Sequence, residues 1–266
     1  MRLFFGKVGE TTATFFAGVF RLYALFAEVV GGIARSFYEK KVVRTPHVFR
    51  QIVLMGVDSL GIICLVGAAV GMVLALQAGY QLKEFGATLY TGSLVAVSIT
   101  RELGPLVAAI VITGRVGARV AAELGTMKVQ EEVDALATMG LNPVRYLVIP
   151  RCLALVIILP CLTVLADVMG MIGGFLIGTL GMGINTYLYV SVSFDALIFK
   201  DIYTGLVKSV IFAMLIALVS CHQGLSVTGG ADGVGKSTTQ AVVISIILVI
   251  VMDCVATAVF YYALPG

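Results

Sequence analysis

The sequence predicts an all-α, polytopic integral membrane protein that has an N-terminal interfacial amphipathic helix, five transmembrane helices and a short cytoplasmic helix. Hydrophobic residues make up 59% of the 266 residues and charged residues 12%, about half of the charged share in a soluble domain. Five apolar runs each approach or exceed the ~20 residues needed to cross the hydrocarbon core. These observations exclude a soluble enzyme, a disordered chain and a nucleic-acid-binding domain.

Residues 1–50 form the first of two predicted domains, a cytoplasmic or interfacial amphipathic region, and residues 51–266 form the membrane domain. Within the first, aromatic residues recur at helical spacing, whereas Arg21, Glu28 and Arg35 lie seven residues apart and share one face. This pattern is typical of a helix that lies in the membrane interface, although a solvated amphipathic helix has the same pattern. The three charges also exclude a cleavable signal peptide.

The membrane domain contains the five apolar runs. The third contains Pro150 and Pro160 and is long enough to be tilted or broken at either residue. The fourth is only just long enough to cross the membrane. The runs cover approximately residues 52–80, 88–113, 146–181, 203–221 and 241–262.

Basic residues are distributed unequally between the loops that join these runs. Of the 18 Lys and Arg residues, eight precede residue 52, five lie within residues 114–151, and Lys236 follows the fourth run. The loops on the other side hold only Lys83 and Lys200. Because Lys and Arg accumulate on the cytoplasmic side of a membrane, the N-terminus is predicted to be cytoplasmic, and five spans then place the C-terminus outside.

Small residues at four-residue spacing mark two of the runs. Gly67 and Gly71 lie in the first run, and Gly170, Gly174 and Gly178 lie in the third. This spacing lets helix backbones approach closely in lipid. Tight helix packing is therefore predicted, either within one chain or between two chains.

The second run carries adjacent opposite charges, Arg101 and Glu102, about midway along its length. An ionised side chain in the membrane is costly unless it faces a partner or a water-filled cavity. Neighbouring residues point about 100° apart on a helix and cannot pair on one face, and Pro105 loosens the helix. The pattern predicts either a polar pocket within the membrane or an ion pair with another span. Candidate partners for such a pair are Asp58, Asp167, Asp253 and Lys208.

A short amphipathic helix is predicted between the second and third runs, over residues 128–139 within a segment of about 126–140. Gly140 suits its C-terminal cap, and Pro143 cannot continue it. Its acidic face favours docking to another protein over resting on anionic headgroups, which repel carboxylates. Val129, Val133 and Leu136 form its apolar edge, and Gln130, Glu131 and Asp134 form its polar edge.

No catalytic or metal-binding site is predicted. The five cysteines form no Cys-x-x-Cys pair, and no His lies near them at ligand spacing. Residues 230–237 match the pattern G-x-x-x-x-G-K-S, but a phosphate-binding loop needs a strand before it and an α/β domain around it. Because membrane spans flank these residues, we expect the glycines to shape a tight cytoplasmic turn, and we expect no cofactor in this chain.

Several of these segments resemble the MlaE/YrbE family of ABC transporter permeases. The resemblance covers about residues 15–262, and Lys236 is a local departure from the family pattern. The motifs that carry it are RELGP at 101–105, AELGTMKVQEEVDAL at 122–136, MGLNP at 139–143, GVG at 233–235 and TTQAVV at 238–243.

The resemblance implies an integral subunit of the bacterial inner membrane that moves phospholipid or related lipids between the inner and outer membranes. Two permease chains pair, usually as a homodimer, and each binds a cytoplasmic ATPase subunit that holds the ATP. A periplasmic MCE-domain protein and, in some systems, a small STAS-domain protein complete the assembly.

The same resemblance implies roles for individual residues. The family's lipid cleft lies at the dimer interface and includes the first two spans, where Arg101 is a candidate for binding the headgroup phosphate. Leu76, Tyr80 and Glu102 are candidates for the cleft wall. The coupling helix that docks on the ATPase corresponds to residues 128–139. Its candidate contacts are Lys128, Glu131, Glu132 and Asp134.

Two other functions are compatible with part of the sequence. An ion-gradient-driven secondary transporter of an amphipathic substrate would need ionisable groups in series and usually internal repeats, and five spans do not divide into equal halves. A membrane scaffold without transport activity would need neither. An ATPase that co-purifies with the chain is expected only of an ABC transporter permease.

Overall fold

The computed structural model describes residues 24–29, 31 and 45–263, which form helices joined by short turns with no strand among them. Most of the predicted N-terminal region, including Arg21 and Arg35, lies outside these residues. Five helices are long and apolar enough to cross a membrane, so the predicted all-α fold with five spans is confirmed. The spans are Val48–Glu84, Thr88–Val129, Val144–Gly181, Phe199–Leu225 and Gly230–Tyr262.

Each of the first three spans is built from more than one helical segment. A 3-10 turn joins α2 to α3, and π-helical turns separate α4 from α5 and α5 from α6. Two further π-helical turns precede and follow α8, which forms most of the third span. The helices are α2 (Thr45–Gly56), α3 (Leu60–Glu84), α4 (Thr91–Ser98), α5 (Gly104–Ile112), α6 (Ala118–Val129), α7 (Glu132–Thr138), α8 (Ile149–Leu176), α9 (Thr186–Ala196), α10 (Phe199–Leu225) and α11 (Gly230–Ala263).

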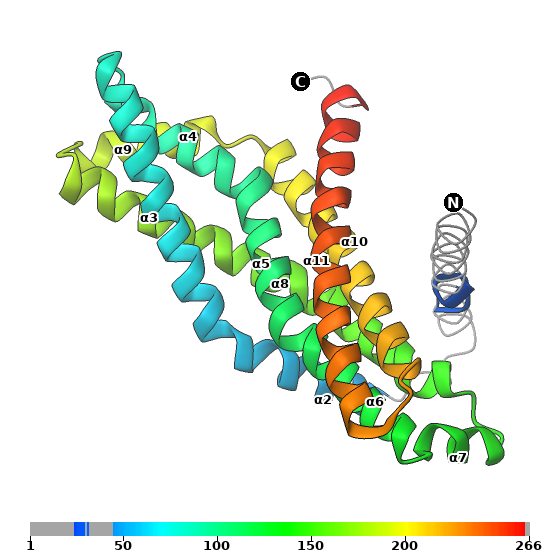
Figure 1. Ribbon diagram of the computed structural model, residues 1–266. Coiled ribbons are helices and arrows are strands. Elements are labelled where there is room, and N and C mark those ends of the chain that lie inside the picture. The colour runs from blue at the N-terminus through cyan, green and yellow to red at the C-terminus, as the bar shows by residue number, and fades with distance from the viewer. Residues whose placement is uncertain (1–23, 30, 32–44, 264–266) are drawn as a thin grey trace, which may run out of the picture.

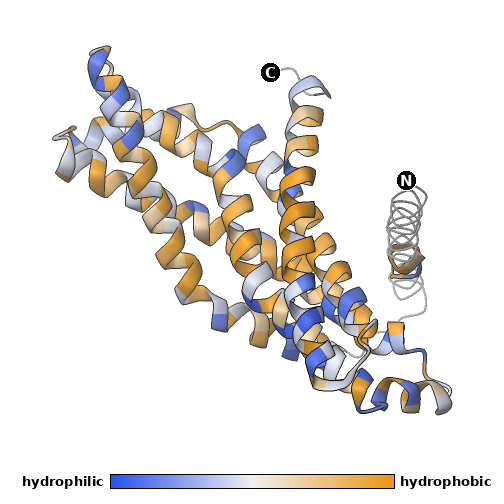
Figure 2. Cartoon of the chain, viewed as in Figure 1, coloured by the Kyte–Doolittle hydropathy of each residue, from blue (hydrophilic) through white to orange (hydrophobic). Residues whose placement is uncertain are grey.

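The spans run between two ends of the molecule (Figure 1). The α3–α4 turn, α9 and the C-terminal end of α11 lie at the upper end, whereas α7 and the α10–α11 turn lie at the lower end. Hydrophobic residues predominate along the spans, and many hydrophilic residues gather at the lower end around α6 and α7 (Figure 2). This distribution is that of a chain whose middle lies in hydrocarbon.

The predicted close packing of small residues occurs within one chain, between α3 and α8. A Cβ atom at Gly71 would collide with the backbone of Gly170, and one at Gly67 would lie 2.9 Å from the carbonyl oxygen of Ala166. Glycine is therefore required on α3 for the two backbones to approach this closely. The remaining core is formed mainly where α5, α6, α8 and α10 meet, around side chains such as Ile112, Leu124, Leu155 and Phe212.

The fourth and fifth spans begin earlier than predicted, at Phe199 and Gly230 instead of about residues 203 and 241. α10 begins at Phe199, where the Asp201 carboxylate accepts the backbone N–H of Ile198 at 3.4 Å and so caps the helix. α11 begins directly after a turn in which Gly229 and Gly230 have φ angles of 89° and 71°, a region that favours glycine. A tight turn does precede the fifth span, but residues 230–237, whose glycines were expected to form it, are the first turns of α11, so the prediction was wrong in this respect.

Helix α9 was not predicted. Its N-cap is Asn185, whose side-chain oxygen accepts the backbone N–H groups of Tyr187 and Leu188 at 2.9 and 3.4 Å. The residues that follow alternate aromatic and β-branched side chains with serine, a pattern that favours a strand as much as a helix. The helix packs against α4 at the upper end of the molecule.

The predicted helix over residues 128–139 is divided in two, and that prediction was wrong in this respect. Lys128 belongs to the last turn of α6, and α7 begins only at Glu132. Between them Glu131 has a φ angle of 60°, which no helix residue can adopt and which is uncommon for any residue except glycine. The chain therefore turns sharply here, and Gly140, with a φ of 77°, ends the segment as expected.

Candidate functional site

The charged pair of the second span lies on a widened helical turn. Arg101 and Glu102 belong to the π-helical turn η3 (Ile99–Leu103), which directly precedes Gly104 and Pro105. Pro105 has no N–H group to continue the regular hydrogen-bonding ladder, and π-helical turns inside α-helices are frequent at functional sites. The helix is therefore loosened before Pro105, as expected, by a turn that contains one extra residue. Because Arg101 and Glu102 lie on this turn, the turn sets the directions of their side chains.

Glu102 joins a cluster of polar side chains from three spans. Its carboxylate accepts a hydrogen bond from Lys208 Nζ of α10, and Thr257 Oγ1 of α11 lies 3.2 Å from both carboxylate oxygens. Lys208 also donates to Thr257 Oγ1 at 2.7 Å and forms an ion pair with Asp253 at 3.0 Å. The Lys208 side chain is only 1% exposed. We call Glu102, Lys208, Asp253 and Thr257 the inner cluster.

Arg101 faces a different partner. Its Nη1 atom lies 3.8 Å from Oδ1 of Asp201, near the start of α10. The Asp201 side chain is 6% exposed and that of Arg101 is 34% exposed. A guanidinium carries five N–H donors, so this one long contact with the described residues leaves Arg101 with donors for another anion.

The sequence predicted either a polar pocket or ion pairs between Arg101 or Glu102 and another span. The structure contains the ion pairs, and two of the four suggested residues take part in them. Lys208 and Asp253 join Glu102, whereas Asp201 was not among the suggested residues. Asp58 pairs elsewhere, and the Asp167 side chain packs against Gly104, with its buried Oδ1 lacking a hydrogen-bond partner among the described residues.

The other two lipid-site candidates lie in a separate groove. Leu76 and Tyr80 are 51% and 73% exposed and project from α3. They line a groove of about 590 Å³ that includes Gln77, Phe85 and Leu94 but neither Arg101 nor Glu102. Within the described residues of one chain the four candidates therefore do not share a pocket, and a cleft that contains all four would need a second chain. Their role in lipid binding stays a prediction.

The α6–α7 turn carries the candidate contacts for an ATPase. Lys128 Nζ donates to both carboxylate oxygens of Asp134 at 2.9 Å, and this ion pair crosses the break between the two helices. Val133 is 7% exposed and packs into the main core. Glu131 and Glu132 are exposed. The turn is thus fixed to the membrane domain on one side and presents the exposed carboxylates of Glu131 and Glu132 on the other.

A second group of charges lies toward the lower end and is called here the end cluster. Arg119 donates to Glu123 at 2.8 Å, which is the i, i+4 stripe expected from the sequence. Glu123 also pairs with Arg151 of α8 at 3.3 Å. Asp58 lies 3.9 Å from Arg115 and 4.0 Å from Arg119. The cluster joins the first three spans, and the sequence showed only the part that lies on one helix.

The residues that resemble a phosphate-binding loop form a helix. Residues 230–237 make the first turns of α11, and Lys236 pairs with Asp232 one turn earlier at 2.6 Å. Helical backbone N–H groups beyond the first turn bond to carbonyl oxygens, so they cannot cradle a phosphate. Within the described residues there is also no group of three or more His, Cys, Asp or Glu side chains that could hold a metal ion.

Comparisons with known proteins cover almost the whole chain. Residues 48–259 match the family model described as Permease MlaE. A probable ABC transporter permease protein of Rickettsia typhi is 39% identical over 96% of each chain. The intermembrane phospholipid transport system permease protein MlaE of Haemophilus influenzae is 33% identical over 98% of each chain. The chloroplastic protein TRIGALACTOSYLDIACYLGLYCEROL 1 of Arabidopsis thaliana is 36% identical over 81% of this chain and 61% of its own length. The chain is therefore a multi-pass membrane protein that belongs to the MlaE permease family.

Proposed function

We propose that the chain is the permease subunit of an ABC transporter that moves phospholipid between the inner and outer membranes. The observation that carries this proposal is the similarity over 98% of both chains to a permease named for intermembrane phospholipid transport. The five apolar spans supply the membrane domain that such a subunit needs. An ion-gradient-driven transporter is not favoured, because relatives that match along 96% of the chain are named probable ABC transporter permease proteins.

ATP hydrolysis belongs to a separate cytoplasmic ATPase subunit in this proposal, and this chain is not itself an enzyme and binds no cofactor. The α6–α7 turn is the proposed docking point, since Glu131 and Glu132 are exposed while Val133 fixes the turn to the core. A basic groove on the ATPase would attract these carboxylates. Movement of the ATPase would then displace α6. This helix is continuous, through one π-helical turn, with α5, and α5 follows the π-helical turn that carries Arg101.

The remaining partners and the orientation are part of the same proposal. The lower end faces the cytoplasm, because α7, the α10–α11 turn and most basic residues of the described part of the chain lie there. The C-terminal end of α11 then faces the periplasm, where an MCE-domain protein would bind, and a STAS-domain protein would join from the cytoplasm. A second permease chain, forming a homodimer, would cover the exposed face of α3 that carries Leu76 and Tyr80.

The chemistry of lipid binding is proposed to depend on Arg101. Its guanidinium is one-third exposed and forms one contact at 3.8 Å, so donors remain for a phosphate, whose oxygens match the guanidinium fork. Glu102 is already held by Lys208 and Thr257. In this arrangement Glu102 would shape the wall beside the headgroup while the apolar faces of the spans accommodate the acyl chains.

The experiment that tests this role compares Arg101→Glu with the exchange variant Arg101→Glu/Asp201→Arg in the purified complex. A charge-assisted hydrogen bond contributes about 1.5–3 kcal/mol, so we expect phospholipid transfer from donor to acceptor vesicles to fall at least about tenfold in Arg101→Glu, with assembly intact. The exchange variant restores the ion pair but not a cation at position 101, and transfer should stay low. If phospholipid transfer is undiminished in Arg101→Glu, or if the exchange variant restores it, Arg101 has only a structural role.

A further inference from the structure

The charged groups around the turn η3 include more carboxylates than cations. Arg101 pairs with Asp201 at 3.8 Å, whereas Lys208 is the ion-pair partner of both Glu102 and Asp253. Three carboxylates from three spans are therefore joined to two cations. An ionised group within a membrane is costly unless it is compensated or reaches water. The printed ion pairs thus leave one negative charge in this group of five residues without a cation of its own.

Glu102 is the carboxylate of this group that a ligand can reach most easily. Its side chain is 32% exposed, whereas those of Asp253 and Asp201 are 15% and 6% exposed. A carboxylate has about four acceptor sites. Glu102 accepts from Lys208 and at most from the single hydroxyl proton of Thr257. Acceptor sites on an exposed carboxylate are therefore still open to a donor from a ligand.

The two charged side chains of η3 are held against one face of α10. Their partners Asp201 and Lys208 are seven residues apart, which is two helical turns or ~10 Å along the axis. Between them, Gly205 packs so closely that a Cβ atom there would lie 2.3 Å from the carbonyl oxygen of Thr100 in η3. This backbone contact fixes η3 to α10, so a cation and a carboxylate are pre-organised on one turn.

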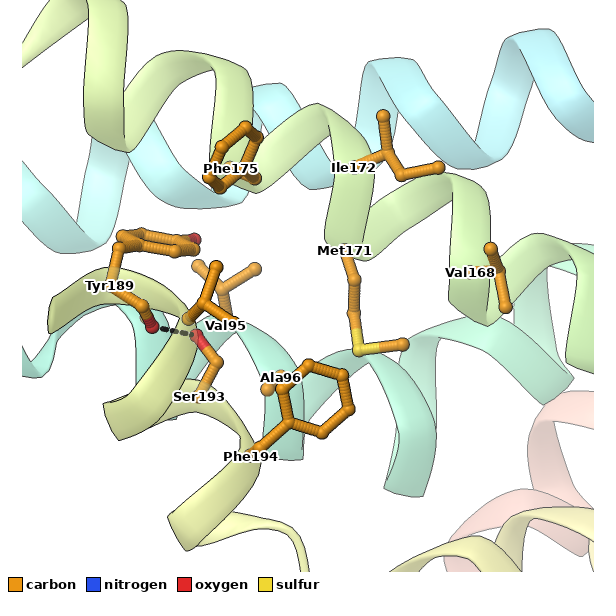
Figure 3. A pocket seen from close by; sticks show the side chains of 11 residues that line it. Val95, Ala96, Val168, Met171, Ile172, Phe175, Tyr189, Ser193 and Phe194 are labelled. Atoms are coloured by element: carbon orange, nitrogen blue, oxygen red, sulfur yellow. Dashed lines mark hydrogen bonds between the residues drawn. The ribbon is translucent and has the colours of Figure 1, made fainter. Parts of the chain in front are cut away.

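Two hollows in the membrane domain offer no such charges. A pocket of about 370 Å³ lies between α4, α8 and α9 (Figure 3), and none of the described residues that line it is charged. Its Ser193 hydroxyl donates to the backbone carbonyl of Tyr189 at 2.7 Å. The groove that contains Leu76 and Tyr80 is also lined by uncharged residues. A lipid headgroup therefore finds no counter-charge in either hollow, whereas η3 presents both signs.

We propose that the permease selects phospholipids whose headgroup carries a primary ammonium group, with the phosphate on Arg101 and the ammonium donating to the Glu102 carboxylate. This inference rests on the proposed transport function and adds the substrate class to it. A zwitterionic headgroup supplies the cation that the five charged residues lack. An anionic headgroup without an amine adds a further negative charge. A quaternary ammonium brings the positive charge but has no N–H group to donate.

The test measures which lipid is moved, as a ratio within one sample. The purified complex receives donor vesicles that contain equal amounts of isotopically labelled phosphatidylethanolamine, phosphatidylcholine and phosphatidylglycerol. Mass spectrometry then quantifies each lipid that reaches acceptor vesicles during ATP hydrolysis. A change in the amount of folded complex alters all three lipids equally, so the ratio reports selectivity and not stability.

We expect the natural chain to transfer about tenfold more phosphatidylethanolamine than phosphatidylglycerol, with phosphatidylcholine between them. Tenfold corresponds to about 1.4 kcal/mol, which is near the lower end for a hydrogen bond to a charged group. Glu102→Gln should bring the ratio close to one. This variant leaves Lys208 paired with Asp253 at 3.0 Å, so the fold should be preserved.

A second variant and a matched control complete the design. Asp201→Asn removes another carboxylate beside Arg101, while its amide oxygen can still accept the N–H group of Ile198. We expect it to lower the ratio several-fold, and it provides the test if Glu102→Gln does not fold. Asp232→Asn removes the same charge at an 80% exposed position in the first turn of α11 and should leave the ratio unchanged.

The possible contrary results separate this inference from the transport function. Equal transfer of the three lipids by the natural chain would overturn the selectivity and leave the transport function intact. An unchanged ratio in a folded Glu102→Gln variant would exclude Glu102 as the ammonium contact, and phosphatidylcholine transfer equal to that of phosphatidylethanolamine would exclude N–H donation. If no lipid is transferred, the proposed function fails and this inference fails with it.

Discussion

The inner cluster and the end cluster contain the same kinds of charged side chain but differ in burial. In the inner cluster Lys208 is 1% exposed and Asp253 is 15% exposed, and both are held by residues of other spans. In the end cluster the side chains of Arg115, Arg119 and Asp58 are between 43% and 51% exposed. Arg151 of the end cluster, at 9% exposed, and Glu102 of the inner cluster, at 32%, depart from this contrast, which therefore applies to the Lys208–Asp253 pair and to the contacts of Asp58 with Arg115 and Arg119.

This difference in burial predicts that ion pairs in the two clusters contribute very different amounts to the free energy of unfolding. Breaking a buried pair by removing one partner costs about 3–5 kcal/mol, because an uncompensated charge stays in a medium of low polarity. Exposed pairs contribute about 0–1 kcal/mol and are screened by salt. We infer that the inner cluster decides how the second, fourth and fifth spans fit together, whereas exposed charges at the lower end are free to interact with water and partner proteins.

The largest effect is expected for Lys208→Met. The change removes the only cation of the inner cluster among the described residues and leaves Glu102 and Asp253 without a counter-charge. We expect a loss of about 3–5 kcal/mol, which lowers the midpoint of thermal unfolding in detergent by about 10 °C. Circular dichroism of the purified chain measures it.

The matched control is the triple variant Lys208→Met/Glu102→Gln/Asp253→Asn, which removes all three charges together. Because neutral replacement of a buried ion pair is often tolerated, this variant should recover most of the lost stability. Asp253→Asn alone keeps the Lys208–Glu102 pair and should cost less than Lys208→Met. Equal stability of Lys208→Met and the natural chain would show that burial does not distinguish the two clusters.

Substitution of the carboxylates of the α6–α7 turn is expected to change the binding of the ATPase and not the stability of the chain. Reversal of Glu131, Glu132 and Asp134 to Lys should release the ATPase subunit or uncouple it, because contacts of this kind set partner choice and association rate. Insertion should survive, since added Lys strengthens the cytoplasmic signal. A pull-down of the ATPase at moderate salt, which limits screening, measures the effect.

The structure sharpens this experiment by separating the three carboxylates. Asp134 is paired with Lys128, whereas Glu131 and Glu132 are exposed. The double variant Glu131→Lys/Glu132→Lys therefore tests docking without disturbing the α6–α7 ion pair. If both variants retain a fully functional ATPase, the docking assignment is wrong. If the turn rests on the membrane instead, the triple variant should bind anionic vesicles more tightly and keep its ATPase.

The sequence predicted the spans and most of the charged partners because hydrophobicity and charge are local properties. Lys208 and Asp253 could be named as candidates since a charge inside an apolar run must be compensated. Asp201 was missed for a positional reason, because the fourth span was predicted to begin at Tyr203, which left Asp201 in a loop. The capping contact of Asp201 with Ile198 extends α10 to include it.

Other features depend on contacts that no sequence window contains. The break between α6 and α7 places Glu131 at a φ of 60°, a conformation that local propensity argues against. Helix α9 has an asparagine cap that gives a usable signal, but the alternating residues behind it obscure that signal. The groove of Leu76 and Tyr80 reaches the second span at Leu94, near the start of that span, but it does not extend to Arg101.

A small effect on stability is expected for Arg119→Ala in the end cluster. Arg119 is 45% exposed, and its partner Glu123 keeps a second cation, Arg151, at 3.3 Å. The loss should be no more than about 1 kcal/mol, or a shift of about 2–4 °C in the unfolding midpoint. The shift should vanish in about 1 M salt, where the Debye length is about 3 Å. A drop as large as that of Lys208→Met would contradict the comparison between the clusters.

The smallest effect is expected for Lys236→Ala, at the most exposed ion pair of the described residues. Lys236 and its partner Asp232 are 74% and 80% exposed, so their pairing should contribute almost nothing to stability. In a true phosphate-binding loop the corresponding lysine reaches the β- and γ-phosphates, and its loss stops turnover. Here the residue lies on the helix α11, where no loop cradles a phosphate.

ATP hydrolysis by the assembled complex should therefore be unchanged in Lys236→Ala, and the phosphate-loop lysine of the ATPase subunit provides the positive control. Replacing that lysine by alanine should abolish hydrolysis while the permease chain is intact. A collapse of hydrolysis in Lys236→Ala, with the ATPase still bound, would mean that this exposed lysine takes part in nucleotide turnover. Exposed charge at the lower end would then have a catalytic role, and the division between a buried structural cluster and exposed partner-facing charges would no longer hold.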